Sequence, residues 1–143
     1  MHASGGIHRS TTTCRACGFS APRLEMWHSL SVAVPEAPTS LEHVLANHWG
    51  REPLLCENDR CEACSIPRQR DKDLQLVAWP QVLVVHLKRW AVISMVPFVQ
   101  RKVTTEIDFE TILPVDVGQP PYHLRGVVVH SGVPGGGHYT AYA

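Results

Sequence analysis

Hydrophobic and polar residues alternate along several segments of the chain, and this pattern predicts β-strands. The clearest segment covers residues 24–34, in which every second residue from Leu24 is apolar or histidine. A period of two over this length predicts one long, half-buried strand with Leu24, Met26, Leu30 and Val32 on its inner face. The stretch "PEAPTS" that follows contains two prolines and is expected to end the strand.

Further strands are predicted in the second half of the chain. Residues 82–87, "VLVVHL", form a nearly unbroken apolar run, which is typical of a central strand covered on both faces. Residues 102–109 alternate again, and residues 122–130 and 138–143 predict two more strands. The stretch "SGVPGGG" between the last two is longer than a tight hairpin turn and is expected to form a loop.

One segment has the periodicity of a helix, over about residues 41–49. Ser40 precedes it and is suited to the N-cap position, while Glu42 falls in the first turn near the positive end of the helix dipole. One face of this helix would carry Leu41, Val44, Leu45 and Trp49. Gly50 is expected to end the helix. Several strands with one clear helix predict an α+β fold that is rich in β-structure.

Composition narrows the class of function. The 143 residues are 44% hydrophobic and 18% charged, which is typical of a globular domain, and 13 basic residues balance 13 acidic ones. This neutral chain has no basic surface for nucleic acid and no apolar run long enough to span a membrane. Residues 1–13 are rich in Ser, Thr, Gly and His and are expected to be disordered. With no secretory signal, we expect a cytoplasmic or nuclear monomer without nucleic-acid or membrane partners.

Two identical cysteine pairs carry the clearest chemistry. Cys14 and Cys17, and Cys61 and Cys64, are each separated by two residues. Such a spacing places two sulfurs on one side of a tight turn, and two turns complete a tetrahedral thiolate site for a structural Zn²⁺. The alternative is four unrelated buried cysteines. The fifth cysteine, Cys56, could be a free thiol, a substitute ligand or a nucleophile, although no neighbouring group would lower its pKa.

Two of the nine histidines differ from the rest in their position. His130 ends one predicted strand and His138 begins the next, so an antiparallel pairing would bring both to one end of the sheet. A histidine at a strand end beside a glycine loop suits general acid–base catalysis. The alternative is a hairpin with a purely structural role. His86 lies in the predicted central strand and is expected to be a buried core residue.

The order of these features resembles the C-terminal half of the ubiquitin-specific protease domain, a cysteine-protease family with a papain-like fold. The segment Pro80–Trp90 is similar to the family pattern LPxVLxxxLKRF, with Trp90 in place of the phenylalanine. The segment Tyr122–Tyr142 is similar to the longer pattern YxLxAVxxHxGxxxxGHYxAY, with Gly126 in place of the alanine. The resemblance covers residues 14–143, nearly the whole chain.

The resemblance implies a fold and a function. Residues 14–79 would form a zinc-binding fingers region with one helix, and residues 80–143 a palm sheet. His138 matches the catalytic histidine of a deubiquitinase, which hydrolyses the isopeptide bond between ubiquitin and a lysine. Residues of the matching loop would contact the substrate, namely His130, Gly132, Gly136, Gly137 and Tyr139. Ubiquitin and ubiquitinated proteins would be the partners.

The sequence departs from the family in one decisive respect. The family's nucleophilic cysteine lies in a conserved box at the head of a helix, and neither this box nor the Asp or Asn that orients the histidine is recognisable here. The thumb region that carries the nucleophile is therefore expected to be absent, and the chain alone is expected to be inactive. Three interpretations follow: part of a complete enzyme, a ubiquitin-binding module without activity, or a zinc-stabilised adaptor.

Overall fold

The computed structural model describes residues 5–54, 60–67, 70–116, 119–133 and 135–143. Within these ranges the chain forms fourteen strands and one helix, so the prediction of a β-rich α+β fold is confirmed. The contacts divide the chain into two compact units. Unit 1 contains residues 1–30 and 46–85, and unit 2 contains residues 31–45 and 86–143. The predicted boundary between residues 79 and 80 differs from this division, because residues 31–45 cluster with the C-terminal segment.

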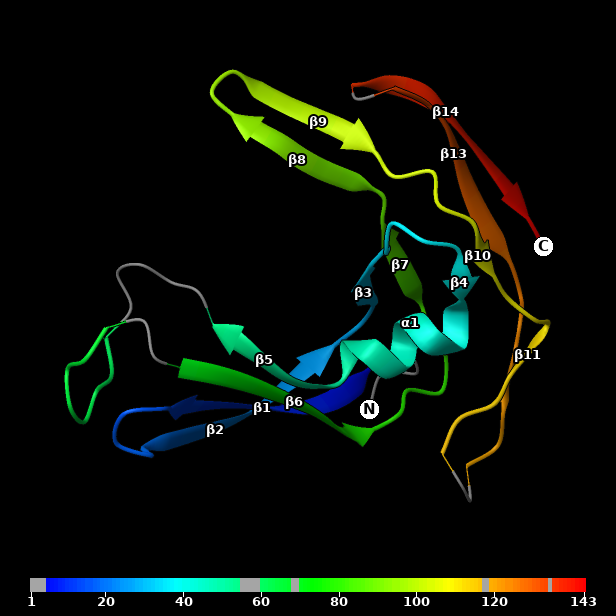
Figure 1. The fold of residues 1–143 in the computed structure, drawn as a ribbon. Helices are drawn as coiled ribbons and strands as arrows, with labels where there is room; N and C mark the ends of the chain where they lie inside the picture. The colour runs from blue at the N-terminus through cyan, green and yellow to red at the C-terminus, as the bar shows by residue number, and fades with distance from the viewer. Residues whose placement is uncertain (1–4, 55–59, 68–69, 117–118, 134) are drawn as a thin grey trace. The chain divides into compact units, whose positions relative to one another are not determined.

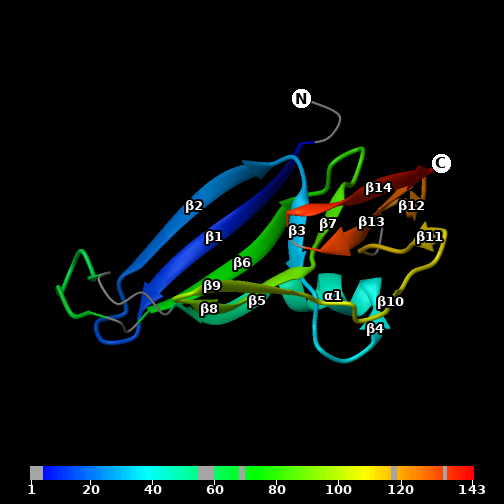
Figure 2. The same cartoon turned by 90° about the horizontal axis from the view of Figure 1, so that it is seen from above.

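Unit 1 is built on a four-stranded antiparallel sheet with the strand order β2-β1-β6-β5 (Figures 1 and 2). Its strands are β1 (Gly6–Cys14), β2 (Ser20–Trp27), β5 (Gly50–Leu54) and β6 (Arg70–Ala78). Figure 2 shows β1 and β6 side by side in the middle of this sheet. One cysteine pair lies at the end of β1 and just after it. The other lies in the sequence between β5 and β6.

The prediction of disorder for residues 1–13 is wrong for residues 6–13, which form most of β1. Strand β1 is an inner strand that pairs with β2 on one side and with β6 on the other. Threonine favours extended backbone because it is β-branched. The hydrogen bonds that order β1 come from its two partner strands, and the polar composition of the segment gives no sign of them. Ser10 is buried, and the Trp27 ring lies so close to Gly6 that no side chain would fit there.

The single long strand predicted over residues 24–34 is also wrong, because the segment forms two strands. β2 ends at Trp27, and β3 (Leu30–Ala33) begins after a bend and pairs with β7 (Val85–Lys88). The bend changes which residues face inward: Trp27, Leu30 and Val32 are buried, whereas Leu24 and Met26 are largely exposed. The alternation of apolar and polar residues continues across the bend, so the sequence pattern alone does not show that the strand ends there.

The prediction of a fully covered strand over residues 82–87 fails as well. The strand begins only at Val85, and Val82 and Val84 are about half exposed. In the described part of the chain, β7 pairs with β3 alone, and a two-stranded ladder leaves apolar side chains in contact with solvent. His86, predicted to be a buried core residue, is exposed, and its Nδ1 lies 3.2 Å from the Ser31 hydroxyl.

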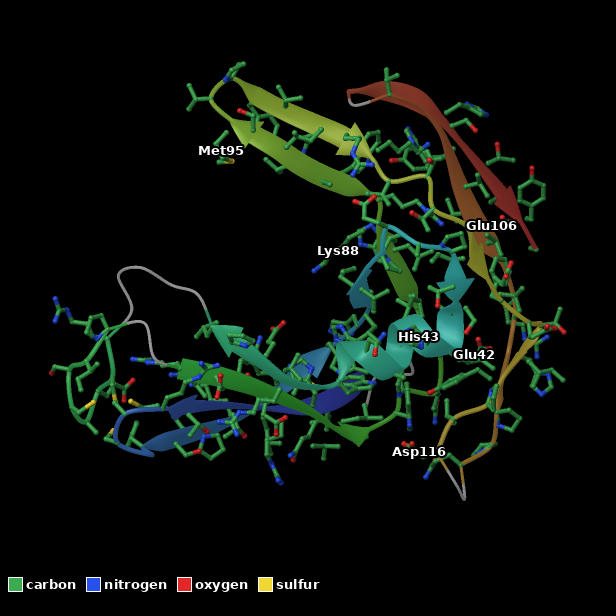
Figure 3. The ribbon with its side chains drawn as sticks, viewed as in Figure 1. Glu42, His43, Lys88, Met95, Glu106 and Asp116 are labelled. Atoms are coloured by element: carbon green, nitrogen blue, oxygen red, sulfur yellow. The ribbon has the colours of Figure 1, made fainter. Side chains whose placement is uncertain are left out.

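Helix α1 (Leu41–His48) agrees with its prediction (Figure 3). The Ser40 hydroxyl accepts a hydrogen bond of 3.3 Å from the backbone N–H of His43, which is the N-cap contact expected from the sequence. Val44 and Leu45 are buried. Gly50, just beyond the helix, has a φ of 115°, a conformation that glycine adopts without strain.

Unit 2 consists of short ladders. The strand pairs are β4 (Thr39–Ser40) with β10 (Ile107–Asp108), β8 (Trp90–Met95) with β9 (Phe98–Lys102), β11 (Ile112–Leu113) with β12 (Tyr122–His123), and β13 (Val127–Val133) with β14 (Gly136–Tyr142). The strand predicted over residues 102–109 is interrupted, because residues 103–106 leave the ladder and Val103 donates a hydrogen bond to the Arg89 carbonyl. Among the described residues of unit 2, the buried apolar ones are Val32, Val44, Leu45, Val103 and Ile107.

None of the helical structure in the described residues has the length and apolar character of a membrane span.

Candidate metal centre and catalytic histidine

The first cysteine knuckle follows directly from the end of β1. The backbone N–H of Gly18 donates to the Cys14 carbonyl at 2.9 Å, and the Cys14 N–H donates to the Phe19 carbonyl at 2.8 Å. Gly18 has a φ of 74°, so the chain turns back on itself through the left-handed region. The turn between these residues brings the Cys17 side chain back beside that of Cys14.

The second knuckle repeats the same hydrogen-bond pattern. The N–H of Ser65 donates to the Cys61 carbonyl at 2.8 Å, and the Cys61 N–H donates to the Ile66 carbonyl at 3.2 Å. Ser65 occupies the position that Gly18 occupies in the first knuckle, and its φ of 58° is also left-handed. Two copies of one turn, held by equivalent bonds, therefore present two cysteine pairs.

The four sulfurs form a cluster of tetrahedral dimensions. The Sγ atoms of Cys14 and Cys64 are 3.8 Å apart, those of Cys17 and Cys61 are 3.7 Å apart, and all four lie within 4.8 Å of one another. A tetrahedral site with metal–sulfur bonds of about 2.3 Å has edges of about 3.8 Å, whereas a disulfide needs about 2.05 Å. The four cysteines are free, and their sulfurs could hold one tetrahedral metal ion.

The acid–base properties of the cluster fit the same interpretation. The backbone N–H of Cys64, and then that of Ala63, help to lower the pKa of the Cys61 thiol to about 6. The N–H of Phe19 acts to lower the pKa of Cys17, but burial and the adjacent cysteines raise it to about 12. Without a cation, one sulfur therefore ionises easily while its neighbour resists, because thiolates this close repel one another. A divalent cation would allow all four to ionise.

The predicted catalytic histidine lies on the hairpin formed by β13 and β14. His138 is exposed and faces Ser131 in the register, while His130 faces Tyr139. Since neighbouring positions of a strand point to opposite faces, His138 and His130 lie on opposite faces of this ladder. The sequence places the two histidines at the same end of the hairpin, and the register separates their side chains.

The predicted seven-residue loop between these strands is shorter than expected. β13 continues to Val133 and β14 begins at Gly136, and these two residues are register partners. Glycine permits this extension: Gly132 has a φ of 140°, and a side chain there would overlap the backbone of Gly136. Gly135, in the turn, has a φ of 81°. The loop is shorter than the sequence predicts because most of these glycines belong to the ladder and not to the turn.

His130 is enclosed by groups from the β8–β9 hairpin and from β14. The ammonium of Lys102 donates to the His130 carbonyl at 2.7 Å and lies 3.4 Å from its Nδ1. The His130 ring is 5.7 Å from the Trp90 ring and 4.7 Å from the Tyr139 ring, between centroids. It also covers Gly137 so closely that a methyl group there would overlap the ring.

A groove of about 430 Å³ lies on this face. Its lining residues are Trp90, Gln100, His130, Val133, Gly135, Gly136, Gly137 and Tyr139. Four of the five predicted substrate-binding residues line it, and Gly132 and His138 do not. Sequence reasoning missed Trp90, Gln100 and Lys102. Only the replacement of the motif phenylalanine by Trp90 could have drawn attention to this group. Cys56 lies outside the described residues.

The chain matches the family model described as "Ubiquitin carboxyl-terminal hydrolase" over residues 2–143. It is 29% identical to ubiquitin carboxyl-terminal hydrolase 21 of Rattus norvegicus over an alignment of 147 residues, gaps included, that covers 95% of this chain and 26% of the relative. It is 38% identical to ubiquitin carboxyl-terminal hydrolase 15 of Homo sapiens over an alignment of 134 residues that covers 87% of this chain and 13% of the relative.

Solved structures agree with this match. A structure of the yeast SAGA DUB module with a mutant Sgf73 matches with a TM-score of 0.79 and 27% identity, over 96% of this chain and 32% of that chain. A SAGA DUB module of Ubp8, Sgf11, Sus1 and Sgf73 bound to monoubiquitin matches with a TM-score of 0.73 and 27% identity, over the same shares. This chain thus spans about a third of the length of these solved chains, and 26% and 13% of the length of the two relatives named above. It belongs to the ubiquitin carboxyl-terminal hydrolase family, and the predicted resemblance is confirmed.

Proposed function

We propose that this chain supplies the general acid–base and the metal-stabilised region of a cysteine-type deubiquitinase. The observation that carries the proposal is His138, which stands exposed on β14 within a segment that matches the family over its whole length. In the complete catalytic domain the reaction would be hydrolysis of the isopeptide bond between the C-terminal glycine of ubiquitin and a lysine side chain. The match to a DUB module bound to monoubiquitin supports ubiquitin as the partner.

In the first half of the proposed reaction, His138 takes up one proton and then delivers it. Its imidazole first accepts the proton of the attacking thiol, and the thiolate forms a bond to the isopeptide carbonyl carbon. When the carbon–nitrogen bond breaks, the imidazolium gives its proton to the departing lysine amine. Water then attacks the thioester carbonyl carbon while the imidazole accepts a proton from it. The carbon–sulfur bond breaks, ubiquitin leaves with a free carboxylate, and the proton returns to the thiolate sulfur.

The nucleophile of this reaction is expected outside the 143 residues. The four described cysteines all belong to the cluster in unit 1, where they are the candidate metal ligands. We therefore propose that the thiolate, and the Asp or Asn that orients His138, are contributed by the remainder of a complete catalytic domain. The relatives' greater length is consistent with this division.

We further propose that the ion held by Cys14, Cys17, Cys61 and Cys64 is a structural Zn²⁺. The sulfur separations support it, since they match the edges of a tetrahedral zinc–thiolate site. Four protein ligands leave no open position for water or substrate, so the ion would stabilise the two knuckles and take no part in hydrolysis. The ion would hold together two knuckles that lie at separate places in the sequence.

The groove beside His130 is proposed to bind the C-terminal tail of ubiquitin. Gly136 and Gly137 line it without side chains, so an extended substrate backbone could approach the ladder closely. Tyr139 and His130 present rings to the same space. Gly132 would contribute indirectly, since its backbone conformation allows β13 to reach Val133.

A second candidate function is a ubiquitin-binding or adaptor module without hydrolytic activity. The observation that favours it is that all four described cysteines belong to the cluster. A chimera separates the two candidates: the 143 residues replace the matching segment of ubiquitin carboxyl-terminal hydrolase 21. Turnover is measured on a ubiquitin–fluorophore conjugate, and affinity for free ubiquitin is measured by calorimetry.

The deubiquitinase proposal predicts that the chimera is active and that His138→Ala abolishes turnover while affinity for ubiquitin stays within about threefold. A chimera that binds ubiquitin and zinc normally but has no activity would favour the binding module. His138→Ala should act on rate and not on affinity because the imidazole interacts with charge that develops only along the reaction path.

A further inference from the structure

A buried carboxylate lies in unit 1 beside the cysteine cluster but is not one of its ligands. Asp71, on β6, is 6% exposed. In the sheet it faces Thr13 of β1 on one side and Pro53 of β5 on the other. Thr13 immediately precedes Cys14, so Asp71 stands one register position from the start of the first knuckle.

Both oxygens of this carboxylate are bonded to arginines that come from different segments. Oδ1 accepts a hydrogen bond of 2.8 Å from Nε of Arg15 and forms an ion pair with Nη2 of the same residue. Oδ2 accepts a hydrogen bond of 2.8 Å from Nε of Arg51 on β5 and pairs with its Nη2. Arg15 lies inside the first knuckle, between Cys14 and Cys17. The carboxylate therefore connects the knuckle to the body of the sheet.

The buried Asp71 carboxylate holds the first knuckle in place, because breaking its bonds to the arginines is costly. A buried carboxylate that loses its partners keeps the cost of its desolvation, so the three-residue arrangement is strongly preferred once formed. Two-point bonding by a planar guanidinium also fixes direction, which a single contact would not. The backbone on either side of Arg15 is thus held in place before any ion binds, and less ordering remains for the ion to impose.

The net charge of Asp71 and its two arginines also favours metal binding at the cysteine cluster. One carboxylate and two guanidinium groups have a net charge of about +1, whereas four thiolates with a divalent cation have about −2. Arg15 lies next to Cys14 in the sequence, so part of this positive charge is adjacent to the cluster. Groups behind the ligands of a metal commonly alter its affinity by about 10- to 100-fold.

We propose that Asp71 is a positioning residue for the metal centre, acting through Arg15 on the knuckle that presents Cys14 and Cys17. This inference rests on the proposed zinc site. The ion pair between Asp71 and Arg15 would keep Cys14 and Cys17 in the geometry that binds the ion. Loss of Asp71 should leave all four ligands present and should loosen the half that Arg15 holds.

The test is the rate at which the full 143-residue chain, loaded with one Zn²⁺, releases the ion to an excess of a chromogenic chelator. Asp71→Asn keeps the size of the side chain and removes its charge, and we expect release at least tenfold faster than in the wild type. Asp73→Asn is the matched control, because Asp73 lies on the same face of β6 and accepts its bond from Gln75. Its release rate should stay within twofold of the wild-type rate.

Arg15→Ala and Arg51→Ala distinguish positioning from general stabilisation of the sheet. If Asp71 acts through the knuckle, Arg15→Ala should accelerate release about as much as Asp71→Asn, and the double variant should add little. Arg51→Ala should have a smaller effect. Equal effects of the two arginine variants, matched by equal losses in the melting temperature of the metal-free chain, would show that Asp71 only stabilises the sheet.

Each remaining outcome has a definite meaning. A wild-type chain that binds no zinc contradicts the proposed zinc site itself. A wild-type chain that holds zinc while Asp71→Asn releases it at the same rate overturns the inference and leaves the zinc site intact. If Asp71→Asn does not fold, Arg15→Ala decides alone, since the Arg15 side chain is half exposed and can be removed without a cavity. Wild-type release from that variant would also overturn the inference.

Discussion

Gly137 precedes His138, and its replacement by alanine tests whether the histidine hairpin is as closely packed as the structure indicates. A Cβ atom at residue 137 would overlap the His130 ring and would lie 2.6 Å from the Ser131 carbonyl oxygen. The ring cannot easily rotate away, because Trp90, Tyr139 and Lys102 enclose it. The carbonyl belongs to the paired strand and can move only with it.

The size of the effect follows from this obstruction. Forcing an extra carbon into a filled site costs about 1–3 kcal/mol when backbone must shift. The neighbouring Gly136→Ala is a matched control, since a Cβ there meets nothing within 4 Å and the residue does not need a left-handed φ. That substitution should be neutral or slightly stabilising, because alanine loses less chain entropy than glycine on folding.

Hydrogen–deuterium exchange of the β13 and β14 amides measures this cost locally. A penalty of about 1–3 kcal/mol corresponds to about 5- to 150-fold faster exchange through opening of the hairpin. We expect Gly137→Ala to show this acceleration and Gly136→Ala to exchange like the wild type. Wild-type exchange in both variants would refute the close packing of His130 over residue 137.

Three further predictions concern the metal, the isolated chain and acid. Mass spectrometry of protein purified without added metal should find one Zn²⁺ per chain, and Cys14→Ser combined with Cys61→Ser should remove it; unchanged zinc would contradict the assigned ligands. The isolated chain should not cleave a ubiquitin–fluorophore conjugate, and turnover abolished by Cys56→Ala would identify that residue as the nucleophile. Arg15, and then Arg51, hold the pKa of Asp71 below its ordinary value of 3.8. A depressed pKa stabilises the folded state above the unfolded-state pKa and loses that contribution as pH falls further. Acid unfolding below about pH 4 should therefore be steeper in the wild type than in Asp71→Asn, and identical curves would contradict the ion pair.

The cysteine cluster was predictable because its evidence is local. Each cysteine pair forms its own turn, and the equivalent bonds made by Gly18 and Ser65 depend on a few adjacent residues. The helix was predictable for the same reason, since the Ser40 cap and the buried Val44 lie within one short segment. The family pattern around His138 was recognisable because many of its positions occur together.

The remaining features depend on pairing between distant segments, which periodicity does not encode. β1 is ordered by β2 and β6, so its polar composition gave the wrong prediction. Before the bend that follows Trp27, the even-numbered apolar residues are exposed, and after it, in β3, they are buried, although the alternation in the sequence continues unchanged. The opposite orientation of His130 and His138 follows from the β13–β14 register, and no feature of the spacing alone specifies it.

Exposed apolar side chains at the end of the β8–β9 hairpin bear on how the chain should be handled. Met95, Val96 and Phe98 are all largely exposed, and Figure 3 shows Met95 at this end of the hairpin. Apolar groups gathered on a two-stranded hairpin favour association with other surfaces. We expect the isolated chain to aggregate more readily than the chimera, and light scattering at matched concentrations measures this. A monomeric isolated chain with a single cooperative melt would contradict the expectation.

The most direct test of the account compares His138→Ala with His130→Ala in the chimera. Turnover of a ubiquitin–fluorophore conjugate is measured for both, with zinc content and ubiquitin affinity as controls for folding. The account predicts that His138→Ala lowers kcat by about 10²–10⁴-fold or more, since it would remove the proposed proton carrier. His130→Ala should reduce turnover less, because this ring packs over Gly137 on the opposite face of the ladder. An inactive His130→Ala beside a His138→Ala that keeps most of its activity would contradict the central claim.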